Sequence, residues 1–156
     1  MRRSRGFTLI EVLVVLTILG VVISGVSVSL EVLRGRDTGL AVERLRWVLE
    51  ATAERARIRG QSIAFETLPD GYRFSMRDTD GRWIALEEAP LFVERVLPDD
   101  LRWAALRVND QSARYIVFGT RSPRFELELL TPDGSVLLRG RGTGEVETRQ
   151  HPRSPA

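Results

Sequence analysis

The stretch "GFTLIEVLVVLTILG", residues 6–20, opens a long apolar run near the amino terminus. From Phe7 to Leu30 the run holds 24 residues, and Glu11 is its only charged side chain. A helix of that length spans about 36 Å, which is enough to cross a bilayer core of about 30 Å. The sequence therefore predicts a transmembrane helix over residues 7–30 that carries one carboxylate.

The segments before and after this apolar run differ in net charge. The residues that precede it include Arg2, Arg3 and Arg5, whereas the charges just after it cancel (Glu31, Arg34, Arg36 and Asp37). The positive-inside rule then places the amino terminus in the cytoplasm and exports the rest of the chain. A cleavable secretory signal is the alternative, but its apolar core is usually about 7 to 15 residues. We therefore expect a single-pass membrane protein whose carboxyl-terminal part is exported.

The composition limits the possible classes of protein. A chain of 156 residues with 43% apolar residues suits one compact domain with an appendage. It contains no cysteine, which excludes disulfides, thiolate metal sites and a nucleophilic thiol. Apart from the three amino-terminal arginines, 20 basic residues face 21 acidic ones. The net charge of +2 thus belongs to the amino-terminal hexapeptide and does not indicate a generally basic surface.

Residues 31–60 continue the helical pattern with an amphipathic period. Between Gly39 and Arg59 the apolar positions fall on one helical stripe, which predicts a core-facing side: Ala41, Val42, Leu45, Val48, Leu49, Thr52 and Ala56. No proline occurs before Pro69, so the membrane helix is free to continue into this one. Gly60 is placed to end it, because glycine accepts the left-handed conformation without steric cost.

Beyond Gly60 the period becomes alternating, which is typical of strands. Eight strand candidates follow: "SIAFET", "YRFSM", "RWIAL", "LRWAAL", "RYIVF", "RFELELL", "SVLLRG" and "GEVET". The turn segments "PDG" (69–71), "TDG" (79–81) and "PDG" (132–134) predict tight turns with a glycine at positive φ. We expect an α+β fold in which an antiparallel β-domain, residues 61–148, packs on the helix, followed by a flexible tail, residues 149–156.

The stretch "RGFTLIEVLVVLTILGVV" resembles the class III signal of type IV pilins and type II secretion pseudopilins. The resemblance implies that residues 1–6 are a leader, that a prepilin peptidase cuts between Gly6 and Phe7, and that the new amine on Phe7 is methylated. Glu11 is the fifth residue of the mature chain. An isolated charge in hydrocarbon costs about 2.5 to 3.5 kcal/mol. We therefore expect Glu11 to be neutralised by the Phe7 amine of a neighbouring subunit.

The later stretches "AERARIRGQSIAFETLPDGYRFSM" and "FGTRSPRFELELLTPDGSVLLRGRGTGEVE" resemble the GspH/FimT family. This resemblance implies a pilin-like fold in which a long helix packs on an antiparallel sheet domain. It also implies a minor pseudopilin of the type II secretion system, assembled with other pseudopilins into a periplasmic filament. Such a protein is anchored in the bacterial inner membrane by a single pass, with its carboxyl-terminal domain in the periplasm. The alternative is a minor type IV pilin of the FimT kind, involved in pilus assembly or DNA uptake.

The DNA-binding alternative depends on arginines near the carboxyl end: Arg121, Arg124, Arg139, Arg141, Arg149 and Arg153. Glu145 and Glu147 interrupt this cluster, and residues 31–156 carry 20 arginines against 20 acids. Non-specific binding of phosphates requires an unbalanced basic face. Nucleic acid is therefore not an expected partner.

No catalytic, cofactor-binding or metal-binding set of residues is expected. His151 is the only histidine and lies in a polar, proline-rich tail, so no triad is available. The acidic pairs Asp78/Asp80 and Asp99/Asp100 are predicted to be solvated turns because no oxygen-rich loop of calcium-binding length surrounds them. The tryptophans are predicted to be core or interface residues: Trp47, Trp83 and Trp103. An enzyme anchored to the membrane is the least favoured class.

Overall fold

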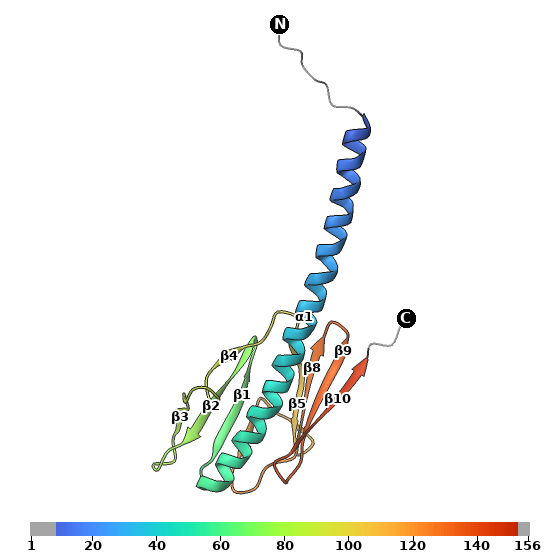
Figure 1. Ribbon diagram of the computed structural model, residues 1–156. Coiled ribbons are helices and arrows are strands. Elements are labelled where there is room, and N and C mark those ends of the chain that lie inside the picture. Colours follow the sequence, from blue (N-terminus) through green and yellow to red (C-terminus); the bar gives the residue numbers. More distant parts are fainter. Residues whose placement is uncertain (1–8, 153–156) are drawn as a thin grey trace. The chain divides into compact units, whose positions relative to one another are not determined.

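The computed structural model describes the backbone of residues 9–152 and the side chains of residues 10–18 and 37–152. The chain divides into two compact units, with the boundary between Asp37 and Thr38. Within the described residues, the first unit is helical, and the second contains the remainder of the same helix and all ten strands (Figure 1). The described β-structure therefore belongs entirely to the second unit.

Helix α1 (Leu9–Arg59) is the only helix among the described residues. Its sequence contains no proline, so no backbone donor is missing from the i to i−4 ladder. The helix ends where Gly60 adopts a φ of 61° and the backbone N–H of Gln61 donates to the carbonyl oxygen of Ala56 over 3.2 Å. This is the Schellman type of helix end, and it confirms the predicted role of Gly60.

The carboxyl-terminal part of α1 buries one face against the sheets (Figure 1). The buried positions follow the predicted helical stripe: Val42, Leu45, Val48, Leu49, Thr52, Ala53 and Ala56. Within that stripe the hydroxyl of Thr52 donates to the carbonyl oxygen of Val48 over 2.6 Å, which satisfies a fully buried polar group. The amphipathic period thus predicted the core-facing side of the helix correctly.

The first sheet is antiparallel and orders its main strands β3-β2-β1-β7. Their bounds are Trp83–Ala85 for β3, Gly71–Arg77 for β2, Ile63–Leu68 for β1 and Tyr115–Phe118 for β7. A short strand, β4 (Arg95–Val96), pairs with the beginning of β2, whereas β3 pairs with its end. The register aligns Phe65 with both Phe74 and Ile116, so these three side chains share the inner face.

The second sheet is also antiparallel, with the order β10-β9-β8-β5-β6. Its strands are β5 (Arg102–Val108), β6 (Gln111–Ser112), β8 (Phe125–Thr131), β9 (Gly134–Gly140) and β10 (Val146–Pro152). Strand β8 alternates buried and less buried residues, with Phe125, Leu127 and Leu129 on the inner face. The alternation of "RFELELL" therefore marked the two faces of this strand correctly.

Aromatic side chains join the inner faces of the two sheets. The ring of Phe65 on β1 lies 5.3 Å from that of Tyr72, 5.6 Å from that of Phe74 and 6.2 Å from that of Trp103, measured between centroids. Trp103 belongs to β5 of the second sheet, and its indole N–H donates to the carbonyl oxygen of Gly71 on β2 over 3.0 Å. The two sheets and the helix therefore share one hydrophobic core.

The loop between β3 and β4 is fastened to the helix by an ion pair. The guanidinium of Arg55 donates to both carboxylate oxygens of Glu88, over 2.7 Å to Oε1, and stacks 4.8 Å above the ring of Phe92. Its hydrogen bond to Glu88 raises the pKa of Arg55, and the same bond lowers the pKa of Glu88. The charged pair therefore holds a loop that carries the buried Phe92 against α1.

The three predicted turn segments all connect antiparallel neighbours, but their glycines differ in conformation. Gly81 and Gly134 have φ values of 80° and 150°, as expected. Gly71 is not among the described glycines with positive φ, so that part of the prediction is wrong. Here a side chain is excluded by contact instead, because an added Cβ would overlap the carbonyl oxygen of Arg95 on β4.

All eight predicted strands are present, and two short ones were missed. Strands β4 and β6 have two residues each, too few for an alternating pattern to be visible. Between β5 and β6, Asn109 and Asp110 have φ values of 50° and 67°. This Asn-Asp pair is a recognisable hairpin signal that the sequence analysis did not use. Strand β10 continues to Pro152, so the tail begins later than predicted, because residues 149–152 pair with β9.

Candidate assembly surface and processing site

The predicted processing site and the assembly carboxylate lie at the amino-terminal end. Gly6 and Phe7, together with the rest of the leader, lie outside the described residues. Glu11 lies in the first turn of α1 and is exposed. A carboxylate there faces the positive end of the helix dipole, which favours it by about 0.3 to 1 kcal/mol. That contribution is smaller than the cost of burying the charge in hydrocarbon.

The side chains around Glu11 form an apolar helical surface. Large apolar side chains between residues 10 and 18 are all exposed: Ile10, Val12, Leu13, Val14, Val15, Leu16 and Ile18. Their exposed fractions reach 69% at Ile10 and 63% at Leu16. An exposed apolar surface of this kind marks a region that contacts a membrane or other protein.

Within the described residues, no helical stretch combines the length and the apolar character that a membrane crossing requires. The predicted span of residues 7–30 extends beyond the side chains that the structure describes.

A second candidate contact surface lies on the helix where it packs on the sheets. Trp47 is 61% exposed, and its indole N–H donates to the carboxylate of Glu43 over 2.9 Å. Arg46 also donates to Glu43 and to both oxygens of Glu50, and lies 5.4 Å from the centroid of Trp47. We call Glu43, Arg46, Trp47 and Glu50 the Trp47 cluster. It holds a large aromatic side chain in one position on the protein surface.

The hydrogen bonds of the Trp47 cluster stabilise the charged forms of its side chains and connect it to β10. The hydrogen bond from Arg46 lowers the pKa of Glu43, and the same bond raises the pKa of Arg46. Glu50 in turn accepts a hydrogen bond over 3.1 Å from the backbone N–H of Val146, the first residue of β10. The pairs of this cluster were not predicted from the sequence. Their spacing of three and four residues is the signal that predicts such pairs.

The other two tryptophans differ in exposure. Trp103 is partly buried and packs against the core, whereas Trp83 on β3 is 46% exposed. The tryptophans were predicted to be core or interface residues, and this prediction is confirmed for Trp103, which packs in the core. Trp83 and Trp47 lie at the surface, where an interface role stays a prediction.

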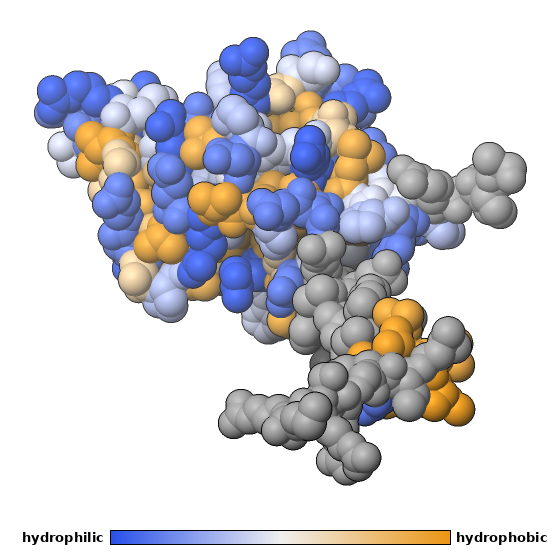
Figure 2. All heavy atoms as spheres, turned by 90° about the horizontal axis from the view of Figure 1, so that it is seen from above, coloured by the Kyte–Doolittle hydropathy of each residue, from blue (hydrophilic) through white to orange (hydrophobic). Residues whose placement is uncertain are grey.

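The arginines of the DNA-binding alternative are only partly compensated by acidic side chains. Arg139 donates to Glu126 over 2.6 and 2.9 Å across neighbouring strands, and Arg141 is paired with Glu147. The remaining described members are exposed (Arg121, Arg124 and Arg149), and Arg153 lies outside the described residues. Two of the six charges are thus compensated locally, and hydrophilic side chains of the second unit alternate with small apolar patches in Figure 2.

The remaining polar candidates lie apart from one another. His151 is exposed on β10 instead of lying in a tail. Asp78 and Asp80 both pair with Arg82 in the turn between β2 and β3. No group of three or more potential metal ligands gathers among the described residues.

The amino-terminal motif and part of the chain match known proteins. Residues 1–27 match the family described as the prokaryotic N-terminal methylation motif. Over 105 residues the chain is 31% identical to the type II secretion system protein H of Aeromonas hydrophila. The matched region covers 65% of this chain and 57% of that protein. The chain thus spans little more than half the length of this relative.

Two solved structures have a similar fold, and both are of the minor pseudopilin EpsH from the type II secretion system of Vibrio cholerae. Their TM-scores are 0.60 and 0.61, at 12% and 11% sequence identity. The similarity covers 72% and 77% of this chain and 96% and 98% of those chains. The fold of this chain is thus similar to that of these minor pseudopilins, and its amino-terminal residues match the methylation motif. The predicted pilin-like α+β class is therefore confirmed.

Exposed apolar side chains lie at several places among the described residues. On α1 they include those around Glu11 and Trp47. On the strands and loops of the second unit they are Trp83, Ile84, Leu91, Val96, Tyr115, Val117 and Leu130. The described part of the chain thus presents apolar surface of the kind that contacts other molecules.

Proposed function

We propose that this chain is a minor pseudopilin, a structural subunit of a type II secretion system and not an enzyme. It assembles with other pseudopilins into the periplasmic filament that drives protein export. The observation that carries the proposal is the methylation motif over residues 1–27, joined to a second unit with the H-type fold. The methylation motif belongs to the segment through which the subunits polymerise. The second unit gives this subunit a surface that differs from those of the other subunits.

Processing generates the charge that assembly requires. A prepilin peptidase cuts after Gly6 and methylates the amine of Phe7, which remains cationic. In a filament this amine approaches Glu11 of a neighbouring subunit and neutralises it within an apolar bundle of helices. The exposed apolar side chains from Ile10 to Ile18 support this arrangement, because they leave the water only when helices bundle or enter the bilayer.

The same helix anchors the subunit in the inner membrane before assembly. The three arginines of the leader hold the amino terminus in the cytoplasm, and the β-rich unit lies in the periplasm. The Trp47 cluster then faces outward from the β-rich unit, where a neighbouring subunit of the filament contacts it. An exposed tryptophan suits such a contact, because tryptophan is enriched among the residues that contribute most to binding.

The alternative of a FimT-like pilin that binds DNA has weaker support. The ion pairs of Arg139 with Glu126 and of Arg141 with Glu147 leave less free positive charge than phosphate binding requires.

The test uses the full-length chain expressed with the other pseudopilins and the prepilin peptidase of one secretion system. We expect mass spectrometry to find the mature chain beginning at a methylated Phe7. Gly6→Leu is expected to leave the leader attached, since the bulky side chain blocks the scissile bond. Glu11→Ala is expected to be processed but to enter filaments about 100-fold less, as an unneutralised amine costs about 2.5 to 3.5 kcal/mol.

Glu31→Ala is the matched control, because it removes a carboxylate from the same helix outside the motif. We expect this variant to assemble like the unaltered protein. If Glu11→Ala assembled as well as Glu31→Ala, the neutralisation mechanism would be wrong. If the unaltered chain kept its leader in the presence of the peptidase, the proposal of a pseudopilin function would be wrong.

A further inference from the structure

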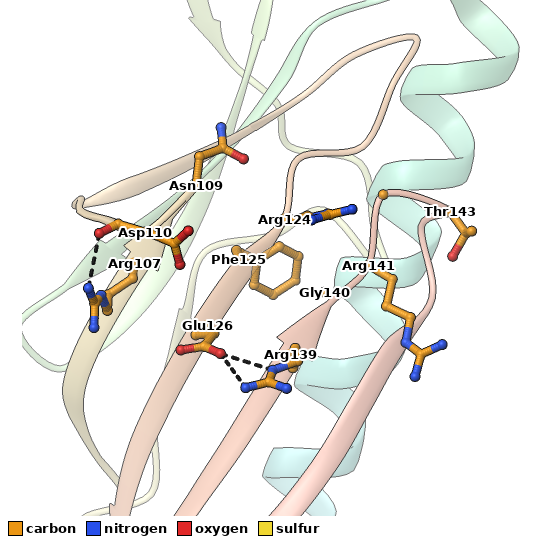
Figure 3. A pocket seen from close by; sticks show the side chains of 11 residues that line it. Arg107, Asn109, Asp110, Arg124, Phe125, Glu126, Arg139, Gly140, Arg141 and Thr143 are labelled. Carbon is orange, nitrogen blue, oxygen red and sulfur yellow. Dashed lines mark hydrogen bonds and ion pairs between the residues drawn. The ribbon is translucent and has the colours of Figure 1, made fainter.

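A cleft of about 770 Å³ opens at one end of the second sheet (Figure 3). It lies between the β5–β6 turn, the start of β8 and the turn that joins β9 to β10. Its apolar lining comes from Phe125, which is buried, and from Gly140 beside it. A volume of this size accommodates a small ligand or a few residues of a peptide.

Four arginines line the cleft: Arg107, Arg124, Arg139 and Arg141. Only Asp110 and Glu126 among the lining residues oppose them with negative charge. The register of the second sheet brings two of these arginines together, because it places Arg107 and Arg139 on either side of Glu126. Residues from three separate segments of the chain therefore concentrate positive charge at this one edge.

These arginines differ in how they are compensated. Arg139 is paired with Glu126, and Arg141 with Glu147. Arg107 donates to the backbone carbonyl oxygen of Asp110 over 3.0 Å, which leaves its charge uncompensated. The side chain of Arg124 is exposed and makes no hydrogen bond or ion pair with another described residue, whereas its backbone carbonyl oxygen accepts a hydrogen bond from the N–H of Asn109 over 2.9 Å.

In Figure 3 the side chain of Arg124 extends toward the β9–β10 turn, across the opening of the cleft. Two guanidinium groups, those of Arg107 and Arg124, thus remain available to an anion.

We propose that this cleft binds a carboxylate side chain of an acidic peptide segment. Arginine recognises a carboxylate with two parallel hydrogen bonds, and the guanidinium groups of Arg107 and Arg124 supply such donors. A polyanion such as nucleic acid fits less well, because Glu126 and Glu147 already neutralise two of the four lining arginines, which leaves too few free cations for a chain of phosphates. This proposal concerns the second unit alone and does not depend on the role in secretion.

The experiment measures peptide binding to the full-length protein in a non-ionic detergent. The probe is a fluorescein-labelled peptide GEFEGS with both ends capped, and fluorescence anisotropy reports binding. The peptide GQFQGS, inorganic phosphate and a 12-nucleotide single-stranded DNA are tested in parallel. We expect GEFEGS to bind, GQFQGS to bind at least tenfold more weakly, and phosphate and DNA to compete poorly with GEFEGS.

Two variants locate the site. Arg124→Gln removes the uncompensated guanidinium at the cleft and is expected to weaken GEFEGS binding about tenfold or more, the usual effect of losing a charged hydrogen bond. Arg121→Gln is the matched control, because Arg121 is also exposed and lies three residues away, outside the lining of the cleft. It changes the net charge equally, and we expect it to leave binding within twofold.

Several results would overturn the proposal. Equal weakening by Arg124→Gln and Arg121→Gln would mean that GEFEGS responds only to net charge. Equal binding of GEFEGS and GQFQGS, or no binding of GEFEGS at all, would exclude a carboxylate site. Tighter binding of the DNA, again lost in Arg124→Gln, would assign the cleft to a polyanion instead.

Discussion

Replacing Gly140 by alanine tests how closely the core is packed beneath β9. Gly140 is buried at the end of β9 and pairs with Phe125 of β8. A Cβ added to Gly140 would overlap the ring of Phe125, which also contacts the ring of Phe118 at 5.9 Å. The ring cannot move toward Phe118, because Phe118 is itself 1% exposed. We therefore expect Gly140→Ala to force the aromatic pair apart.

The expected size follows from two opposing contributions. Inserting a methyl group into a packed core costs about 1 to 3 kcal/mol. Replacing glycine by alanine also restricts the unfolded chain, which stabilises by about 0.4 to 1 kcal/mol where the native φ allows it. Gly140→Ala should therefore lower the free energy of unfolding by about 1 to 2 kcal/mol. Gly119→Ala, with no atom within 4 Å of the added Cβ, should leave it unchanged or slightly raised.

The assay is urea unfolding of the full-length protein in detergent, followed by tryptophan fluorescence and extrapolated linearly to water. A third variant adds Phe125→Leu to Gly140→Ala and removes the ring atoms that the new methyl group meets. We expect this double variant to be more stable than the sum of the two single changes by at least about 0.5 kcal/mol. The reasoning is refuted if Gly140→Ala and Gly119→Ala are equally stable, or if the double variant is simply additive.

Two further predictions concern the contacts of α1. Leu45→Ala should lower the free energy of unfolding by about 2 to 5 kcal/mol, because Leu45 is fully buried. The control is Leu40→Ala, since Leu40 is 64% exposed. In the same urea titration it should change the free energy of unfolding by less than about 0.5 kcal/mol. Glu88 has its pKa lowered from its ordinary value of 4.5 by the hydrogen bond from Arg55. Its ionised form thus stabilises the fold above about pH 4.5, and this contribution disappears as the pH falls through the lowered pKa. The urea midpoints of the unaltered protein and Glu88→Gln should therefore differ at pH 7 and converge toward pH 3, and a constant difference would contradict the pairing.

Much of the fold was predictable because its signals are local. The stripe from Val42 to Ala56 and the alternation of Phe125, Leu127 and Leu129 each depend on neighbouring residues alone. Helical and alternating periods reflect which face of one element is buried, so they can be read before the partner is known. For the same reason the eight longer strands were found, and the two-residue strands were not.

The tertiary structure decided which distant residues meet. Arg139 pairs with Glu126, 13 positions away, because the β8–β9 register aligns them. This pairing compensates the charge of one member of the arginine cluster. Gly71 and Gly140 are required by backbone and ring atoms that approach from other strands, not by their own φ angles. The cleft beside Arg124 arises likewise from three segments. Such contacts depend on strand register, and register follows from how the whole core packs.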